Sequence, residues 1–372
     1  MPEADAQFSF APGVLRCVRV PEVEKALADL WRAANEAVER GAVPVTTRAA
    51  LLSLVVLCRT EEEAETAART VALLVNSHPS RAVIAVVNPH SSDEHADAFV
   101  SAHCSLTSGS ARQVCCEEVR LHLNGPVARF LSATVSSLLL PDLPVFGWVV
   151  GDPSAWNSTL LETAALCDKL LINTGALRSP VDSLPSVAAV VAGTPDAVFG
   201  DLLWIQLEHV RSRIVSAFDD PEAVETLSRA AEVELSVPSA SLSAALLTVG
   251  WFAHRLRWTP ESQADGDDGC LFRFRAEDGA ARSVKLKLGG TPDRAALLLP
   301  AQGRNSFRVE LPGFETVPPA APIEAASTAA SASQNSAVLL CEALEYPGRE
   351  SEWEHALYTA AAMLKAPRNN GN

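Results

Sequence analysis

The chain has 372 residues, of which 48% are hydrophobic and 20% charged, and its mean hydropathy is +0.12. This composition excludes a mainly disordered protein, and the length suggests about two domains. The 45 acidic and 30 basic residues give a net charge of −15, whose field repels nucleic acid and anionic lipid surfaces. We therefore expect neither nucleic acid nor a membrane among its partners.

The first part of the chain alternates between helix and strand patterns. Apolar residues recur at a helical period over 21–40, and residues 51–58 are nearly all apolar, as in a short strand buried on both faces. Another helical pattern follows, and residues 82–87 form a second buried strand. This order predicts a βαβ unit, in which the two strands lie parallel in one sheet.

The turn after the first buried strand lacks a nucleotide-binding signature. A dinucleotide fold carries glycines there, whereas residues 58–63 read Cys-Arg-Thr-Glu-Glu-Glu. Thr60 and Glu63 have capping-box spacing and start the helix, but three glutamates at its N-terminus repel the phosphate that such a helix end otherwise attracts. The nucleotide hypothesis therefore fails at this turn, and we expect no cofactor.

The α/β pattern continues to about residue 220. The expected strands are 96–104, 113–123, 145–150 and 169–174. The expected helices are 125–138, 160–166 and a long one capped by Asp201 that runs to Phe218.

The second half of the chain reads as α+β, with a hairpin typical of an antiparallel sheet. We assign residues 1–44 to an N-terminal segment, 45–220 to an α/β domain with a mixed sheet, and 221–372 to a smaller α+β domain. The expected strands are 233–237, 271–275, 283–288, 296–299 and 306–311, with helices over 242–256 and 350–365. Residues 263–269 are expected to form a polar turn, and the Ala/Ser/Pro-rich residues 316–337 a flexible insertion.

Histidines and cysteines gather between residues 90 and 122, which raises the question of a metal site. Adjacent strand residues point to opposite faces, so His103 is separated from Cys104, and Cys115 from Cys116. No C-x-x-C pair occurs, and a bond between adjacent cysteines strains the peptide. We expect neither a metal site nor a disulfide framework. The residues of this region are His90, His95, His103, Cys104, Cys115, Cys116 and His122.

Catalytic patterns are also missing from the sequence. Glu117 and Glu118 are strand neighbours that face apart, and neither G-x-S-x-G nor H-E-x-x-H occurs. His78, Ser80 and Arg81 form the most suggestive polar cluster, because Ser80 and Arg81 have the chemistry to hold a phosphate or a partner's carboxylate. The cluster lies at the amino end of its strand, whereas ligands of open α/β sheets bind beyond the carboxyl ends, which favours a structural role.

Four collinear segments resemble the glucose-6-phosphate dehydrogenase assembly protein family, OpcA. The likeness covers roughly residues 45–225 and weakens towards residue 312; Cys167-Asp168-Lys169 and Asn173-Thr174 depart from the family pattern. The segments are residues 59–87 with His78-Pro-Ser-Arg81, Gln113-Val-Cys-Cys-Glu-Glu-Val-Arg-Leu-His-Leu123, Leu139-Leu-Pro-Asp-Leu-Pro-Val145 with Trp148, and Gly200-Asp-Leu-Leu-Trp204 through Arg211 to Asp219-Asp-Pro221.

The resemblance implies a non-catalytic cytoplasmic protein that binds glucose-6-phosphate dehydrogenase. It would activate that enzyme allosterically, promote its active oligomer and support the oxidative pentose phosphate pathway. Two alternatives stay open: a sugar-phosphate sensor or enzyme that uses the cluster at His78 to Arg81, and a metal-dependent hydrolase built on the His/Cys region. The residues expected to serve partner binding or a structural motif are His78, Ser80, Arg81, Asp142, Trp148, Asp201, Trp204 and Arg211.

Overall fold

The computed structural model describes residues 11–106, 112–266, 268–289, 295–299, 307–311 and 326–369. The chain divides into two units, each made of separate stretches. The first unit consists of Met1–Gly151, Ser158–Leu171 and Ile323–Gly348, and the second of Asp152–Asn157, Ile172–Pro322 and Arg349–Asn372. None of these stretches begins or ends at residue 220, where the sequence predicted a domain boundary. The division into domains over 45–220 and 221–372 therefore stays a prediction.

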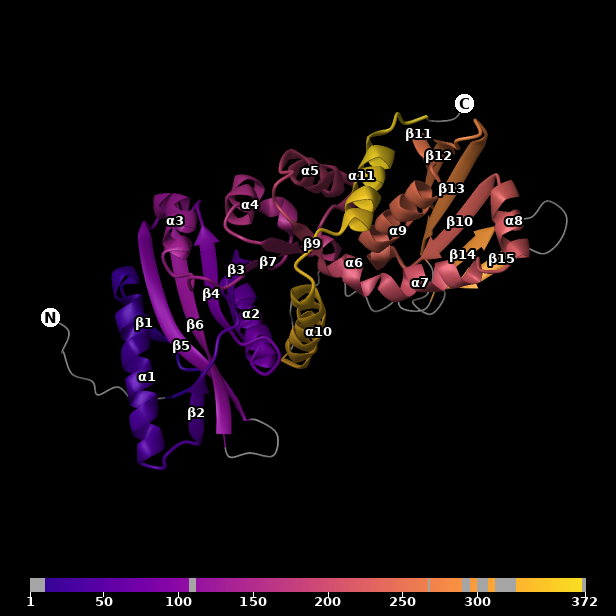
Figure 1. Ribbon diagram of the computed structural model, residues 1–372. Coiled ribbons are helices and arrows are strands. Elements are labelled where there is room, and N and C mark those ends of the chain that lie inside the picture. Colours follow the sequence, from indigo (N-terminus) through magenta and orange to yellow (C-terminus); the bar gives the residue numbers. More distant parts are fainter. Residues whose placement is uncertain are drawn as a thin grey trace. The chain divides into compact units, whose positions relative to one another are not determined.

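The first unit is a mixed β-sheet with helices on both faces (Figure 1). The expected helix at 21–40 and the βαβ unit are confirmed. The strands are β1 (Arg16–Val18), β2 (Val45–Arg48), β3 (Leu52–Cys58), β4 (Ser80–Asn88), β5 (His95–Leu106), β6 (Arg112–Asn124), β7 (Val145–Val149) and β8 (Lys169–Ile172). The helices are α1 (Val23–Glu39), α2 (Glu61–Leu74), α3 (Leu131–Ser136), α4 (Asn157–Ala164) and α10 (Ala326–Glu345), with 3-10 turns η1 (Val20–Glu22) and η2 (Gly125–Phe130).

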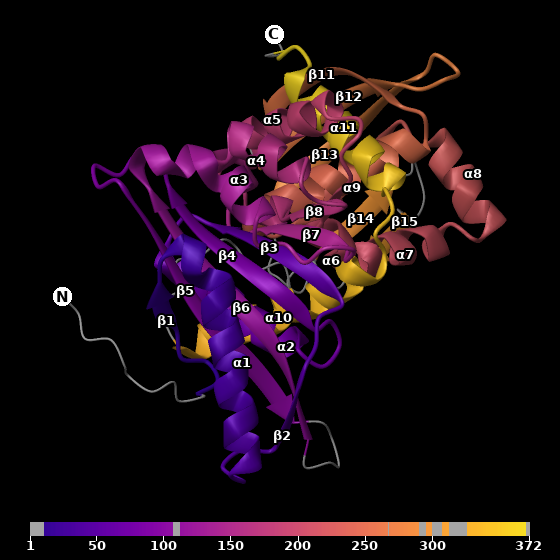
Figure 2. The ribbon, with the colours of Figure 1, turned by 60° about the vertical axis from the view of Figure 1, so that its left-hand side comes forward.

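The strands of this sheet follow the order β1-β5-β6-β4-β3-β7-β8, and β2 pairs with the first residues of β6. Strands β4, β3, β7 and β8 run parallel to their neighbours, whereas β5 is antiparallel to β6 and to β1. All seven residues of β3 are buried, which fits a strand covered on both sides. Helix α1 covers one face, and α2 and α10 cover the other (Figure 2).

Helix α10 corrects the expectation of a flexible insertion at 316–337. Residues 326–337 belong to this helix, while residues 316–325 lie outside the described residues. The helix contacts α2, and the Sγ of Cys341 lies 3.3 Å from the Oγ of Ser77. Alanine is the best helix former, so contact with α2 converts a segment of loop-like composition into a helix.

The second unit combines a mostly antiparallel sheet with a helical layer, as the expected α+β class requires. Its strands are β9 (Phe199–Asp201), β10 (Glu232–Val237), β11 (Thr259–Gly266), β12 (Gly269–Arg275), β13 (Ala281–Leu288), β14 (Ala296–Leu299) and β15 (Phe307–Glu310). Its helices are α5 (Pro180–Gly193), α6 (Leu202–Gln206), α7 (Glu208–Ala217), α8 (Pro221–Arg229), α9 (Leu242–Arg255) and α11 (Ser351–Lys365), with 3-10 turns η3 (Pro153–Ala155), η4 (Thr174–Ala176) and η5 (Ser239–Ser241).

The sheet formed by β10 to β15, called sheet B here, has the order β11-β12-β13-β10-β14-β15. The pairing of β10 with β13 is parallel and the other pairings are antiparallel. Helix α9 covers one face of sheet B and contacts α11 (Figure 1). The two helices approach so closely at Gly250 that a Cβ there would lie 2.3 Å from the carbonyl oxygen of Ala356. Glycine is therefore required where α9 crosses α11.

Two local expectations for the second unit are wrong, and two helices are additional to those expected. The helix expected from Asp201 to Phe218 is broken at Leu207, which separates α6 from α7. Residues 263–266 belong to edge strand β11 and not to a turn, because both β12 and the backbone around Arg368 pair with them. The sequence interpretation assigned no helix to α5 or α8.

Candidate functional site

Arg81 is the centre of the polar cluster that the sequence singled out. Its Nε donates to the Oε2 of Glu117 over 2.7 Å, and its Nη1 donates to the carbonyl oxygen of Leu138 over 3.0 Å. Both Nη atoms also donate to the carboxylate of Glu24 on α1. Arg81 is 3% exposed, and its three nitrogens are all occupied. Its guanidinium therefore links α1 to the sheet and is almost inaccessible to solvent.

Glu117 gathers further donors around the same point. Its Oε1 accepts from the Nε1 of Trp31 over 2.6 Å and lies 2.9 Å from an Nη of Arg48. Burial opposes the charge of Arg81, but the neighbouring carboxylates of Glu117 and Glu24 raise the pKa of Arg81 above its ordinary value. The cluster on the α1 face is thus an ion-pair network with a buried Arg81–Glu117 pair at its centre, and it links α1, β2, β4 and β6.

His78 and Ser80 do not join Arg81 at a common site. Successive strand residues point to opposite faces, so Ser80 lies on the α2 face while Arg81 lies on the α1 face. The Oγ of Ser80 and the Nδ1 of His78 are buried without a hydrogen-bond partner among the described residues. The backbone N–H of His78 donates to Leu74 and closes the end of α2. The three residues of the expected cluster therefore diverge.

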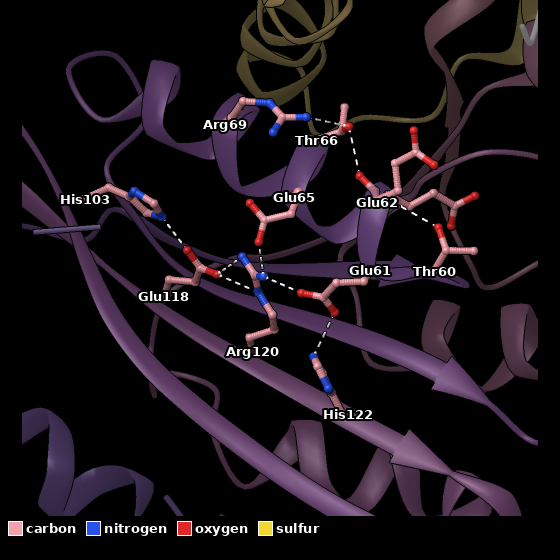
Figure 3. A network of polar contacts seen from close by, with 11 residues as sticks. Thr60, Glu61, Glu62, Glu65, Thr66, Arg69, His103, Glu118, Arg120 and His122 are labelled. Atoms are coloured by element: carbon pink, nitrogen blue, oxygen red, sulfur yellow. Dashed lines mark hydrogen bonds and ion pairs between the residues drawn. The ribbon is translucent and has the colours of Figure 1, made fainter. Parts of the chain in front are cut away.

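A second network, which the sequence analysis missed, lies under α2 on the opposite face of the sheet (Figure 3). Arg120, on β6, is 2% exposed; it donates from Nη2 to Glu118 over 2.9 Å and from Nη1 to Glu61 over 2.7 Å. The same Nη1 also donates to Glu65, and the Nε2 of His103 contacts the carboxylate of Glu118.

Charge compensation shapes the titration of this network. Burial opposes ionisation of Glu118, but the hydrogen bond with His103 and the charge of Arg120 hold the pKa of Glu118 below its ordinary value. Burial likewise opposes the charge of Arg120, yet the contacts with Glu65 and Glu118 raise the pKa of Arg120. The signal in the sequence was the alternation of Glu118, Arg120 and His122 along one face of a strand, which is unusual for a buried sheet.

Asp201 lies at the centre of a polar cluster in the second unit. Its Oδ1 accepts from the backbone N–H groups of Thr174 and Leu203, and its Oδ2 accepts from the Oγ1 of Thr174 and the Nε1 of Trp353. The cap expected at Asp201 is therefore confirmed, although it opens the short α6. Complete burial raises the pKa of Asp201 to about 6 despite these hydrogen bonds.

Trp204 and Arg211 form a stacked pair beside this cluster. The guanidinium carbon of Arg211 lies 3.6 Å from the centroid of a Trp204 ring, and its Nη1 donates to the carbonyl oxygen of Trp204 over 2.6 Å. Burial lowers the pKa of Arg211 to about 10. Trp204 is buried, whereas Arg211 is half-buried. The pair joins the end of α6 to the first turns of α7.

The two remaining expected residues lie apart from these clusters. Trp148, on β7, is buried in the sheet of the first unit. Asp142 is exposed in the turn before β7, where its φ of +62° is a left-handed value that aspartate tolerates better than most residues. Of the eight expected residues, the structure brings together Asp201, Trp204 and Arg211 as neighbours along α6 and α7.

Several His and Cys side chains of this region form pairs with other side chains. Within the described residues, no group of three or more His, Cys, Asp or Glu side chains is placed to hold a metal ion. Contrary to the sequence expectation, Cys104 and Cys115 form a disulfide, because they are directly opposite each other on antiparallel strands β5 and β6. Spacing along the chain could not show this cross-strand register.

The N-terminus of α2, which the sequence analysis considered for nucleotide binding, is capped by side chains of the same segment. Thr60 accepts from the backbone N–H of Glu63, and the carboxylate of Glu63 accepts from the backbone N–H of Arg59. The helices of the described residues include none that is long and apolar enough to cross a bilayer. Taken together, the polar clusters described here bind elements of the fold to each other, and the arrangement is that of a two-unit α/β protein.

Comparison with known proteins identifies the family. Residues 55–189 match the glucose-6-phosphate dehydrogenase subunit N-terminal domain, and residues 197–357 match the corresponding C-terminal domain. The chain therefore belongs to the OpcA family of these subunits. It is 28% identical over 213 residues to "Putative OxPP cycle protein OpcA" of Nostoc punctiforme, covering 56% of this chain and 45% of that protein. It is 27% identical over 224 residues to the protein of the same name from Synechococcus elongatus, covering 59% and 49%.

The chain thus spans about half the length of the curated relatives it matches. Among solved structures, scyllo-inositol dehydrogenase from Lactobacillus casei is similar with a TM-score of 0.40 and 7% identity, covering 86% of this chain and 97% of that one. A myo-inositol dehydrogenase from Corynebacterium glutamicum gives a TM-score of 0.41 and 9% identity, covering 85% and 96%. Likeness at this level carries no argument about function.

Proposed function

We propose that this protein binds glucose-6-phosphate dehydrogenase, activates it allosterically and promotes its active oligomer, performing no chemistry of its own. The observation that carries the proposal is the family match, which extends over both units. The protein would then serve the oxidative pentose phosphate pathway, in the cytoplasm where that dehydrogenase works. The polar clusters support the part of the proposal that assigns no chemistry to this protein. Their charged groups form hydrogen bonds with residues of α1, α2 and α11 and so hold these helices in place.

The solvent exposure of the eight expected residues shows which of them we propose as contacts with the partner. Asp142 is exposed, and His78 and Arg211 are half-buried, so these three side chains are accessible to a second protein. The other five expected residues, Ser80, Arg81, Trp148, Asp201 and Trp204, are buried and would act through the fold. Arginine is a frequent anchor of protein interfaces, which favours the half-buried Arg211 as the first residue to test.

The experiment mixes the purified chain with glucose-6-phosphate dehydrogenase from the same organism. We expect a stable complex, a larger dehydrogenase assembly by mass photometry and a higher dehydrogenase rate. The Arg211→Ala variant should weaken the complex, while Arg32→Ala, which removes an exposed arginine of α1, serves as the matched control. Absence of any complex with the unmodified chain would refute the proposal.

The sugar-phosphate alternative is disfavoured by the occupancy of Arg81. A phosphate could bind its guanidinium only if the contacts with Glu117, Glu24 or Leu138 were broken first. Calorimetry with glucose 6-phosphate and the chain alone separates the two proposals, because only a sensor or enzyme requires binding without the dehydrogenase.

A further inference from the structure

The face of sheet B opposite α9 carries charged side chains on β10 and β13, the two central strands of the sheet. Along β10, Val233 and Leu235 are buried against α9, whereas Glu232 and Glu234 point to the other side. Along β13, Val284 and Leu286 are buried in the same way, and the residues between them face outwards. Alternate strand residues occupy opposite faces of a sheet. We call the face opposite α9, to which Glu232 and Glu234 point, the outer face.

The outer face carries an acidic strand directly beside a basic one. Strand β10 contributes Glu232 and Glu234, and the neighbouring β13 contributes Lys285 and Lys287. Glu234 is opposite Lys285 in the register, and the Nζ of Lys287 lies 2.8 Å from the carboxylate of Glu234. The two strands are thus adjacent stripes of opposite charge.

Strand β12 extends the basic stripe. Arg273 is opposite Ser283 of β13, and the Nη1 of Arg273 is buried without a hydrogen-bond partner within the part of the chain that is described. Arg275 lies on the same strand and pairs with Glu261. Arg273 and Arg275 thus add two cations on the strand beside β13.

These stripes are complementary to themselves under a two-fold rotation. An axis parallel to the strands, between β10 and β13, places β10 of one copy over β13 of the other and the reverse. Residues of one register row stay level, so Glu234 of each copy faces Lys285 of its mate, as an isologous interface requires. Two sheets stacked face to face keep their strands aligned to within about 30°.

The size of the face is sufficient for such a pairing. Six strands spaced about 4.8 Å apart, with four to eight residues each at about 3.4 Å per residue, present roughly 600 Å² before long side chains are counted. A typical specific interface buries about 800 Å² on each partner. Extended Lys, Arg and Glu side chains supply the difference.

We propose that two copies of this chain associate through the outer face of sheet B, with β10 of each copy opposite β13 of the other. The occupant is a second copy because the charge pattern matches itself. This inference does not depend on the proposed function, since it concerns the isolated chain.

Two reciprocal variants test the proposal by analytical ultracentrifugation of the full chain across a concentration series. Glu232→Lys with Glu234→Lys makes the face basic, and Lys285→Glu with Lys287→Glu makes it acidic. The unmodified chain should sediment as a species of twice 39.4 kDa, and each variant alone should associate at least about tenfold more weakly. An equal mixture of the two variants should recover the dimer, which misfolded proteins would not do.

Glu225→Lys with Arg229→Glu, on the exposed surface of α8, is the matched control and should leave dimerisation unchanged. A monomeric unmodified chain overturns the proposal, as does a dimer that tolerates both variants or a mixture that stays monomeric. If the unmodified chain is a monomer and the variants instead lose binding to the dehydrogenase, the face belongs to that partner and the proposal is likewise wrong.

Discussion

Arg81 and Glu117 form an ion pair of 2.7 Å in which both side chains are only 3% exposed. The pair lies between β4 and β6, directly opposite each other in the register, and Glu24 reaches it from α1. Removing one partner of such a pair leaves an uncompensated buried charge, which costs far more than the intact pair contributes. Substitution of Arg81 therefore tests whether the polar cluster that the sequence singled out stabilises the fold.

Arg81→Met should lower the free energy of unfolding by about 3–5 kcal/mol, because Glu117 then lacks its buried cation. Urea denaturation measures the change. The Arg32→Met variant, which alters an exposed arginine, should change stability by less than about 0.5 kcal/mol. Equal stability of Arg81→Met and the unmodified chain would show that Arg81 is not part of the scaffold.

Asp201 makes stability depend on pH in the opposite direction from most carboxylates. The folded chain keeps its proton up to about pH 6, whereas an ordinary aspartate loses it near 3.8. The folded state therefore binds more protons between these values, and stability falls as pH rises through this window. The unmodified chain should lose about 3 kcal/mol relative to Asp201→Asn between about pH 4 and pH 7.

Chemical denaturation at a series of pH values checks this prediction. The exposed Asp142→Asn variant is the control and should retain the slope of the unmodified chain. A slope that is the same with and without Asp201 would contradict the assignment.

Glu118 should have the reverse effect, since its pKa is lowered in the folded state. Its contribution is present above the ordinary pKa of glutamate, near 4.3, and is lost as pH falls through its lower folded value. Glu118→Gln should cost about 2–4 kcal/mol at neutral pH, because Arg120 loses a buried partner, and the cost should shrink in acid. Thermal melts of Glu118→Gln at neutral and acidic pH measure this loss, with the exposed Glu62→Gln as control. A loss that is equal at both pH values would contradict the prediction.

The register of β5 and β6 makes Cys104 and Cys115 partners, which leads to a prediction about thiols. Alkylation of the denatured, unreduced protein should label six of its eight cysteines. Cys104→Ser with Cys115→Ser should lower stability by about 3 kcal/mol, the cost expected when a closed loop of about eleven residues is released. Labelling of all eight cysteines would refute the bond.

Local patterns determined much of the fold. Alternation over 96–104 and 113–123 indicated β5 and β6, and the capping pattern at Thr60 correctly marked the start of α2. The opposite orientation of Glu117 and Glu118 was also predictable, because side chains alternate along a strand. The structure adds that each glutamate belongs to a different ion-pair network, one on each face.

Long-range relationships were not predictable from the sequence. Nothing near Arg81 indicates that Glu24, fifty-seven positions earlier, supplies its carboxylate. The composition of 326–337 suggests a loop, but contact with α2 in the first unit stabilises it as a helix. The break at Leu207 is a change in the backbone, since Leu203, Leu207, Val210 and Ile214 are all buried at a helical spacing across it. The apolar period that predicted one helix therefore could not reveal the break.

The central claim is that this protein acts on glucose-6-phosphate dehydrogenase and catalyses no reaction itself. The most direct measurement follows NADPH formation by the dehydrogenase alone, by this chain alone and by the mixture, with glucose 6-phosphate and NADP as substrates. We predict no turnover by the chain alone and a higher rate in the mixture, accompanied by a larger dehydrogenase assembly. Steady turnover by the isolated chain, or a mixture no faster than the dehydrogenase alone, would contradict it.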